Sequence, residues 1–247
     1  MDVKWNIDNV DEVSSTNDLV YSSILKDPSL KEGFGVTAGF QSKGRGERGN
    51  SWESLKNKNL LLSFLLKPGL PVSRQFLLSQ IISLAIAEYL VNHDIDGVKI
   101  KWPNDIYVHD RKIAGILIQN ILHGRAIRNS IIGIGLNLNQ TEFYSNAPNP
   151  ISLKAITGND YSIQTECLLL LDTITKNYTE LFKVRKAKPQ NMYRFLLYRL
   201  NKKATFLDKE NIPFEGIIKG VDDQGNLEVE RQHGIEHFGF KEIKYVI

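Results

Sequence analysis

The stretch V-K-I-K-W-P-N-D-I-Y-V, residues 98–108, indicates a strand that ends in polar residues. Its first five residues alternate between apolar and lysine side chains, as in a strand that buries one face and exposes the other. Pro103 has no backbone N–H to give to a neighbouring strand, so it should end or kink this strand. Asn104 and Asp105 then lie at a strand end, where enzymes built on sheets often place polar groups. The stretch therefore predicts a sheet with a candidate site at its edge.

Further strands are expected on both sides of this stretch. Ile106–Val108 resumes strand character, H-D-R-K makes a tight turn, and strands follow at Lys112–Asn120 and Ser130–Asn139. Upstream, Leu60–Leu66 is apolar at nearly every position, which indicates a central strand covered on both faces. Such a run of strands, with helices before and after it, predicts an α+β fold with a mixed, largely antiparallel sheet.

The remaining elements of this sheet domain are predicted from caps and periodicity. Apolar residues at helical spacing predict four helices, and Ser14 or Ser15 should cap the first while Ser73 caps the second. The expected helices are Ser15–Lys26, Ser73–His93, Thr165–Arg185 and Asn191–Leu200. Val3–Val13 is expected to be an edge strand, and Phe34–Phe40 another strand.

The character of the sequence changes near Asn201. Five or so short strands separated by turns follow in fewer than 50 residues, as in a small β-barrel module. We therefore divide the chain into residues 1–200 and residues 201–247.

Composition limits the classes of function. The 247 residues carry 31 cations and 28 acids, a net charge of +3, which does not favour nucleic acid as the partner. Cys167 is the single cysteine, so no internal disulfide can form, and a reducing compartment is expected. The amino terminus lacks the apolar core of a signal peptide, and the longest apolar runs are too short to span a bilayer. We expect a cytoplasmic protein.

The five histidines show no paired ligand spacing, so the sequence contains no evident metal cluster.

A glycine- and arginine-rich loop, Q-S-K-G-R-G-E-R-G-N-S-W, occupies Gln41–Trp52. Glycines let the backbone approach a ligand, and guanidinium groups bind phosphate or carboxylate through paired hydrogen bonds, so the loop can cradle an anion. Its letters match the dinucleotide fingerprint G-x-G-x-x-G, but no acidic residue follows at the required spacing before the strand at Leu60, and we reject that interpretation. A solvated basic turn is the alternative.

Five motifs together resemble the biotin–protein ligases, also called biotin–[acetyl-CoA-carboxylase] ligases. The motifs are S-T-N at Ser15–Asn17, the Gln41–Trp52 loop, K-W-P-N-D at Lys101–Asp105, R-K-I-A-G-I-L at Arg111–Leu117 and G-I-G-L-N at Gly133–Asn137. The resemblance implies a catalytic domain like that of class II tRNA synthetases, followed by an SH3-like module. It also implies ATP, Mg²⁺ and biotin as ligands and a carboxylase carrier domain as partner. Because the chain starts at the catalytic domain, we expect a ligase without the DNA-binding repressor domain of some relatives.

The resemblance also implies roles for individual residues. Biotin is assigned to the predicted first helix and nearby loops, namely to Ser15, Thr16, Asn17, Gln41, Gly46, Lys112 and Gly115. The nucleotide is assigned to Arg45, Arg48, Trp52, Lys101, Asn104 and Asn137. Catalysis is assigned to Lys112, Arg45, Arg48 and Asp105. The sequence leaves open whether Asp105 holds Mg²⁺, holds Lys112 or helps to deprotonate the acceptor lysine.

The loop departs from the family pattern at two positions. Glu47 stands where many members carry a second arginine, and Asn50 replaces another cation, so the loop carries less positive charge than is usual. Two rival functions are a lipoate–protein ligase, whose different glycine signatures are not seen here, and a non-enzymatic polyanion-binding protein. The sequence does not tell whether the chain forms a homodimer, or which carboxylase is its acceptor.

Overall fold

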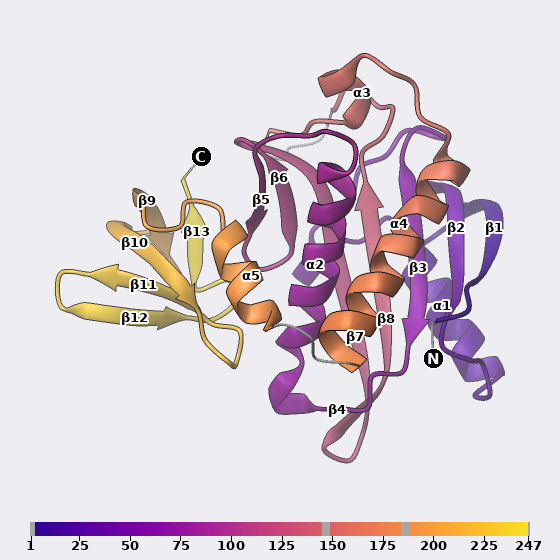
Figure 1. The fold of residues 1–247 in the computed structure, drawn as a ribbon, viewed down its shortest axis with the longest axis horizontal. Helices are drawn as coiled ribbons and strands as arrows, with labels where there is room; N and C mark the ends of the chain where they lie inside the picture. The colour runs from indigo at the N-terminus through magenta and orange to yellow at the C-terminus, as the bar shows by residue number, and fades with distance from the viewer. Residues whose placement is uncertain (1–2, 145–148, 184–187, 247) are drawn as a thin grey trace.

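A mixed sheet covered by helices on both faces forms the larger part of the protein. The computed structural model describes residues 3–144, 149–183 and 188–246. Figure 1 shows α2 and α4 in front of this sheet, α1 behind it, and a second sheet at the carboxy-terminal end of the chain.

The larger sheet has one parallel pair among its neighbouring strands. The order across the sheet is β1 (Asn6–Val13), β2 (Phe34–Gln41), β3 (Leu60–Leu66), β8 (Ala126–Leu136), β7 (Arg111–His123), β6 (Asp105–Val108) and β5 (Val98–Lys101). The β1–β2 pair is parallel, whereas the other pairs along this order are antiparallel. A two-residue strand, β4 (Leu70–Pro71), also pairs with β8. The predicted mixed, largely antiparallel sheet is confirmed.

The central strand β3 is buried at all seven positions, as its almost wholly apolar sequence predicts. Its residues alternate between two cores. Phe64 packs in the large core shared with α2 and α4, whereas Leu65 packs with Val20 and Ile24 of α1 in a smaller cluster. The sheet is therefore anchored from both faces, and α1 is held at a fixed place beside it.

The helices lie near their predicted positions, with different ends. They are α1 (Thr16–Lys26), α2 (Phe76–Val91), α3 (Leu153–Thr157), α4 (Ile163–Asn177) and α5 (Pro189–Leu196), with short turns at Val72–Arg74, Glu47–Gly49 and Tyr178–Lys183. Ser15 caps α1 as predicted, because its side chain accepts a hydrogen bond from the Asp18 N–H. Ser73 does not cap α2: it lies in a 3₁₀ turn, and the helix begins only after Gln75.

Three further boundaries correct the sequence analysis. Helix α5 ends at Leu196 and not at Leu200, because Leu197 is extended and forms a bridge with Ile100 of β5. Helix α4 begins before Thr165, since Ser162 caps it, and its predicted end at Arg185 lies outside the described residues. Strands β7 and β8 are longer than predicted towards their connecting turn, where Ile121 pairs with Asn129, Leu122 with Ile127 and His123 with Ala126. Helix α3 was not predicted.

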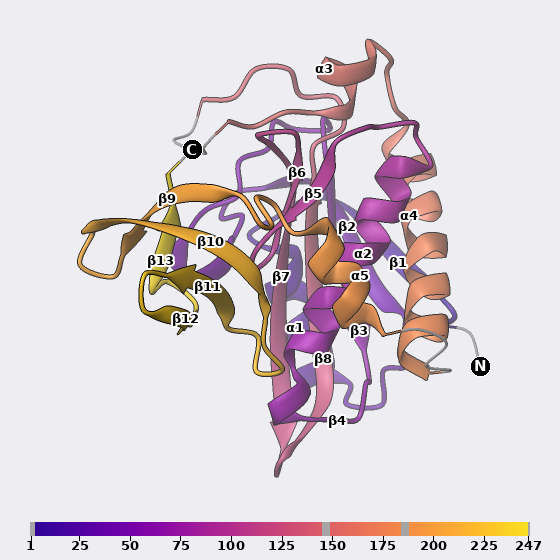
Figure 2. The ribbon, with the colours of Figure 1, turned by 60° about the vertical axis from the view of Figure 1, so that its left-hand side comes forward.

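Five antiparallel strands form the second sheet. Their order is β12 (Gly234–Phe238), β11 (Leu227–Arg231), β10 (Pro213–Val221), β9 (Lys203–Asp208) and β13 (Ile243–Tyr245). We call residues 203–245 the C-terminal module. Figure 2 shows it beside the β5–β6 end of the larger sheet.

The C-terminal module is fixed to the larger sheet through Trp102, the residue after β5. The indole Nε1 of Trp102 donates to the Gly225 carbonyl at 2.9 Å, and its ring lies 5.2 Å from the ring of Phe240. Trp102 is almost fully buried by this contact. The strand predicted to present the candidate site therefore also carries the module.

Among the described residues, none of the helices has the length and apolarity needed to cross a membrane.

Candidate active site

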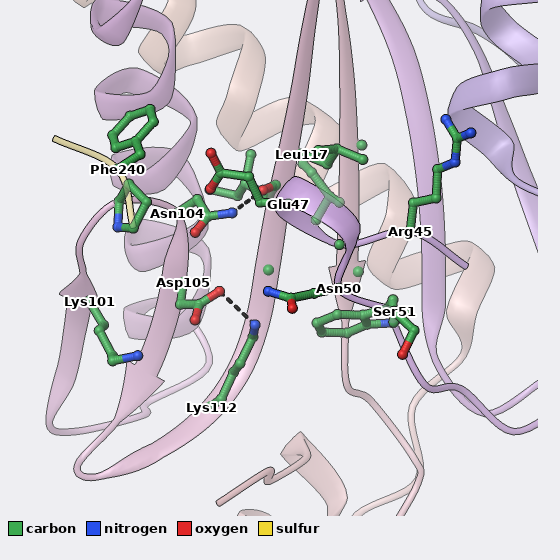
Figure 3. A pocket seen from close by; sticks show the side chains of 18 of the residues that line it. Arg45, Glu47, Asn50, Ser51, Lys101, Asn104, Asp105, Lys112, Leu117 and Phe240 are labelled. Atoms are coloured by element: carbon green, nitrogen blue, oxygen red, sulfur yellow. Dashed lines mark hydrogen bonds and ion pairs between the residues drawn. The ribbon is translucent and has the colours of Figure 1, made fainter. Parts of the chain in front are cut away.

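A cavity of about 640 Å³ opens where the larger sheet, the glycine–arginine loop and the C-terminal module meet. Figure 3 shows its side chains converging from these separate segments. Of the residues assigned to a site from the sequence, the cavity lining includes Ser15, Thr16, Asn17, Gln41, Arg45, Gly46, Trp52, Lys101, Asn104, Asp105, Lys112 and Gly115. Segments far apart in the sequence thus form one site.

The start of α1 forms a polar end of this cavity. The side-chain oxygen of Gln41 accepts hydrogen bonds from the Thr16 backbone N–H at 2.7 Å and from the Thr16 hydroxyl at 3.0 Å. Ser63 of β3 lies within hydrogen-bond distance of Thr16 and Asn17, at 2.7 and 2.5 Å. Asn17 also donates to Gln119 of β7 at 2.9 Å. Because these polar groups are buried or half-buried and bonded to one another, their positions are set before any ligand arrives.

Ser63 and Gln119 are parts of this network that the sequence analysis missed. Each lies inside a strand segment, Ser63 among apolar residues and Gln119 next to Asn120, so periodicity assigns it to the strand and gives no reason to single it out. A polar residue in a strand that is buried on both faces is the signal that could have identified Ser63.

Three glycines on β7 and β8 leave space for larger groups on the cavity floor. A Cβ on Gly133 would come within 2.2 Å of Asn17 Oδ1, and a Cβ on Gly135 within 2.3 Å of the Trp52 ring. Gly115, which pairs with Gly135, also has the Trp52 ring above it, and a Cβ added there would lie 2.9 Å from that ring. The Trp52 ring of the loop thus occupies the space that a side chain at position 115 would need, and the assignment of Gly115 to biotin stays a prediction.

Two polar residues follow the K-W-P sequence and meet β7. Asp105 forms an ion pair with Lys112, whose Nζ lies 2.6 Å from Asp105 Oδ1. Both side chains are about four-fifths buried, with exposed fractions of 18% for Asp105 and 21% for Lys112. Asn104 donates from its amide to the Ile116 carbonyl at 2.7 Å and accepts from the Ile116 N–H at its own carbonyl. Of the three alternatives left open for Asp105, the structure shows the contact with Lys112 (Figure 3).

Lys101 is held between two aromatic rings. Its Nζ lies 5.2 Å from the Tyr107 ring centroid and 5.0 Å from that of Tyr245, which comes from the C-terminal module. Burial lowers the pKa of Lys101 below its ordinary value, although the nearby Asp105 carboxylate acts in the opposite direction. Such a desolvated cation gains more than an exposed one when an anion is placed beside it.

The charged side chains of the glycine–arginine loop lie on different sides of the cavity. Arg45 forms an ion pair with Asp18 of α1 at 2.9 Å, with both side chains largely exposed. Figure 3 shows Arg45 on the side of the cavity away from Lys112 and Asp105, whereas Glu47 lies over the cavity. The side chain of Arg48 lies outside the described residues.

Asn137 is not among the residues that line the cavity. Its side chain is nearly fully buried, where its amide donates to the Ile151 carbonyl at 3.0 Å. Its assignment to the nucleotide remains a prediction. The lining does include residues that the sequence analysis did not select, namely Trp102, Leu117, Gly133, Lys209, Phe240, Lys241, Lys244 and Tyr245.

No group of three or more histidine, cysteine, aspartate or glutamate side chains capable of holding a metal occurs among the described residues. The cavity itself contains the carboxylates of Asp105 and Glu47. Mg²⁺ is commonly held by one or two carboxylates together with substrate phosphates, so this donor set fits Mg²⁺ brought in with a nucleotide.

Comparisons with known proteins agree on one family. The model of the biotin/lipoate A/B protein ligase family matches residues 10–137. The bifunctional ligase/repressor BirA of Escherichia coli is 31% identical over 228 residues, which cover 90% of this chain and 68% of that protein. The biotin–[acetyl-CoA-carboxylase] ligase of Paracoccus denitrificans is 27% identical, with 81% of this chain and 85% of that protein covered. Among solved structures, the biotin protein ligase from Aquifex aeolicus in complex with biotin and ATP has a TM-score of 0.79 at 25% identity, covering 98% and 99% of the two chains.

Proposed function

Because the chain belongs to the biotin/lipoate A/B protein ligase family, we propose that it activates biotin with ATP as biotinyl-5′-AMP and transfers biotin to a carboxylase carrier domain. The acceptor is a lysine of acetyl-CoA carboxylase or a related carboxylase. The observation that carries the proposal is the cavity, in which the fixed polar network at Thr16 and Asn17 and the Asp105–Lys112 pair face a common space.

The first step brings two anions together. A biotin carboxylate oxygen attacks the α-phosphorus of ATP, the bond from that phosphorus to the bridging oxygen breaks, and pyrophosphate leaves. Two unit charges about 3.5 Å apart repel by roughly 5 kcal/mol at an effective dielectric constant near 20. Lys112 neutralises the carboxylate and Lys101 the phosphate side, so that the cavity removes most of this repulsion.

Asp105 orients Lys112 for this role. Without a carboxylate beside it, the flexible lysine side chain would adopt many rotamers, whereas the 2.6 Å ion pair holds its ammonium at the cavity wall. Mg²⁺ bound with ATP would supply further positive charge on the phosphates, with Asp105 as its protein ligand.

The second step forms the amide. The acceptor lysine amine attacks the carbonyl carbon of the mixed anhydride, AMP leaves, and the amine loses a proton. Because the anhydride also reacts with water, the loop of Gly46 and Trp52 serves to cover it. Arg45, now paired with Asp18, and Arg48 are the loop cations that we assign to the phosphate of the adenylate.

At the level of the fold, we assign residues 1–200 to a class II tRNA synthetase-like catalytic domain and residues 201–247 to an SH3-like module. The mixed sheet and the five-stranded antiparallel sheet support this assignment. Cys167, the single cysteine of the chain, is buried and free, which supports the cytoplasmic location that we propose.

The decisive assay is biotin-dependent exchange of labelled pyrophosphate into ATP, followed by transfer of labelled biotin to a biotin carrier domain. We expect exchange with biotin and little with lipoate. Exchange that depends on lipoate instead would establish the lipoate ligase. Binding of polyanions without any consumption of ATP would reject both enzymes.

A further inference from the structure

The glycine–arginine loop folds back on itself above the cavity, so its position depends on how its two ends are held. Within the loop, the Trp52 N–H donates to the Gly44 carbonyl at 3.0 Å, and Arg45 forms a bridge with Ser51. Figure 3 shows the loop over the cavity, and the Trp52 ring lies against Gly135 on the floor. The contacts of the chain before and after the loop therefore determine where Trp52 lies.

The first end of the loop is bonded to the start of α1. The side-chain oxygen of Gln41 accepts the two hydrogen bonds from Thr16, and the Lys43 N–H donates to the Ser14 carbonyl at 2.9 Å. This end of the loop therefore cannot move without disturbing the polar network at α1.

The second end of the loop is bonded to Gln140, which comes from the segment after β8. The side-chain oxygen of Gln140 accepts hydrogen bonds from the Leu55 N–H at 2.9 Å and from the Asn59 amide at 2.8 Å. Its side-chain nitrogen donates to Glu53 Oε1 at 3.2 Å and to the Glu142 carbonyl at 2.8 Å. Gln140 is 1% exposed, and these four contacts use its two donor and two acceptor positions.

Asn59 fixes the segment that carries Gln140. The side-chain oxygen of Asn59 accepts a hydrogen bond from the Leu138 N–H at 3.0 Å, and the neighbouring Lys58 carbonyl accepts one from the Asn139 N–H at 2.9 Å. Asn59 is as deeply buried as Gln140. If the Gln140 amide were reversed, its nitrogen would face two donors and its oxygen two acceptors, so the surrounding groups permit one orientation only.

From these contacts we propose that Gln140 is a positioning residue for the reaction: with Asn59 it fixes the chain just after Trp52 and keeps the Trp52 ring on the cavity floor. Gln140 is not among the residues that line the cavity, so it acts through Trp52 and the loop. The inference rests on the proposed function, in which the loop covers the adenylate.

Loss of the Gln140 contacts should affect the two steps of the reaction differently. The Asp105–Lys112 pair contacts neither Gln140 nor Asn59, so the groups assigned to the attack of the carboxylate on ATP stay in place. A loop held at one end only covers the adenylate less completely, so that the adenylate escapes and water enters. Retention of the adenylate should therefore suffer more than its formation.

The first test is Gln140→Met, which keeps a side chain of similar length but makes none of the four hydrogen bonds. We expect labelled biotinyl-5′-AMP to leave about 10-fold faster than from the wild-type chain, while biotin-dependent pyrophosphate exchange stays within about threefold. Asn177→Leu is the matched control, because this amide is also buried and bonds to Glu88 and the Thr173 carbonyl, away from the cavity. It should lower the melting temperature and leave the release rate unchanged. Equal release from the two variants would reduce the role of Gln140 to general stability and overturn the inference.

A rescue experiment tests the contact between Gln140 and Glu53 directly. Gln140→Glu keeps an acceptor for the Leu55 N–H but places a second carboxylate at the contact with Glu53, so release should be at least as fast as from Gln140→Met. Adding Glu53→Gln returns a donor to this contact and should slow release at least about threefold. Because both substitutions alter buried or half-buried polar groups, a loss of stability alone would predict no such recovery.

Limited proteolysis of the ligand-free protein tests the position of the loop separately from the reaction. Trypsin cleaves after Lys43 and Arg45, and we expect cleavage there to be about fivefold faster in Gln140→Met than in the wild-type chain or Asn177→Leu. Equal cleavage of Gln140→Met and the wild-type chain would overturn the inference even if biotin-dependent exchange is observed. If the wild-type protein shows no exchange but Gln140→Met exposes the loop to trypsin, the proposed reaction fails and the positioning of the loop by Gln140 stands.

Discussion

Replacing Lys112 by methionine removes the cation that we assign to the biotin carboxylate and keeps a side chain of similar length. The change also leaves the Asp105 carboxylate, which is 18% exposed, without the ammonium that lies 2.6 Å from it. Both consequences act in the same direction, because the cavity loses a positive charge and keeps an unpaired negative one. We expect the adenylation step to suffer most.

The size of the effect follows from the geometry. At an effective dielectric constant near 20, the attraction between charges 2.6 Å apart is about 6 kcal/mol, and that across about 3.5 Å is roughly 5 kcal/mol. Water that enters the vacated space and movement of Asp105 will reduce this value, so about 3–4 kcal/mol should remain in the barrier. This corresponds to a loss of roughly 10²- to 10³-fold in kcat/KM for biotin activation.

The assay is biotin-dependent pyrophosphate exchange, with a thermal melt to show that the variant folds. The double variant Lys112→Met/Asp105→Asn removes the unpaired carboxylate and should recover about 10-fold over Lys112→Met alone. A Lys112→Met enzyme within fivefold of the wild-type rate would refute the assignment of Lys112 to the carboxylate. A double variant no faster than the single one would show that Asp105 has another task.

Three other predictions address the loop, the floor and the core. Arg45→Ala breaks the pair with Asp18 and should speed release of biotinyl-5′-AMP, measured by trapping labelled adenylate, while pyrophosphate exchange persists; unchanged release would exclude Arg45 from adenylate retention. Gly135→Ala places a Cβ about 2.3 Å from the Trp52 ring, so the ring must move, and we expect a red shift of the fluorescence and a higher KM for ATP. Burial raises the pKa of the Cys167 thiol from 9.0 to about 11, so the unfolded chain loses this proton at lower pH than the folded one. The stability contributed is present below pH 9 and falls by about 2–3 kcal/mol as the pH rises to 11, which urea unfolding of the wild-type chain and Cys167→Ala should reveal as a difference in slope with pH.

Much of the sheet could be predicted because its sequence signals are local. Six of the seven residues of β3 are apolar, which predicts a strand covered on both faces, and Pro103 ends β5 wherever the strand lies in the fold. The cap at Ser15 is equally local, since it needs only the N–H groups of the next turn.

The errors in the predicted helix ends occur where contacts with residues distant in the sequence determine where a helix begins or ends. Ser73 has the chemistry of a cap, but the chain enters α2 through a 3₁₀ turn because β4 pairs with β8 just before it. The end of α5 is set by Leu197, which bridges to Ile100 about a hundred residues earlier. Neither pairing can be recognised from the residues next to the affected helix.

The sequence analysis predicted those residues of the site that lie in the five sequence motifs. The pairing of Lys112 with Asp105 follows from two motifs on neighbouring strands, and both were selected. The lysines of the C-terminal module were not selected, because exposed lysines in a short strand-rich segment have the appearance of ordinary surface residues. Contacts between segments far apart in the sequence, among them Trp102 with Gly225 and Lys101 with Tyr245, bring them to the cavity.

The first turn of α1 serves two parts of the site with consecutive residues. Thr16 and Asn17 lie at the polar end of the cavity, while Asp18 forms an ion pair with Arg45 of the loop on the side away from Lys112. A substitution that shifts the backbone of this turn must therefore disturb both the polar network that we assign to biotin and the Arg45–Asp18 pair that holds the loop. To change one of these two parts without the other, a substitution must alter one side chain and leave the backbone in place. Asp18→Asn, which leaves Thr16 and Asn17 in place, is the simplest such substitution.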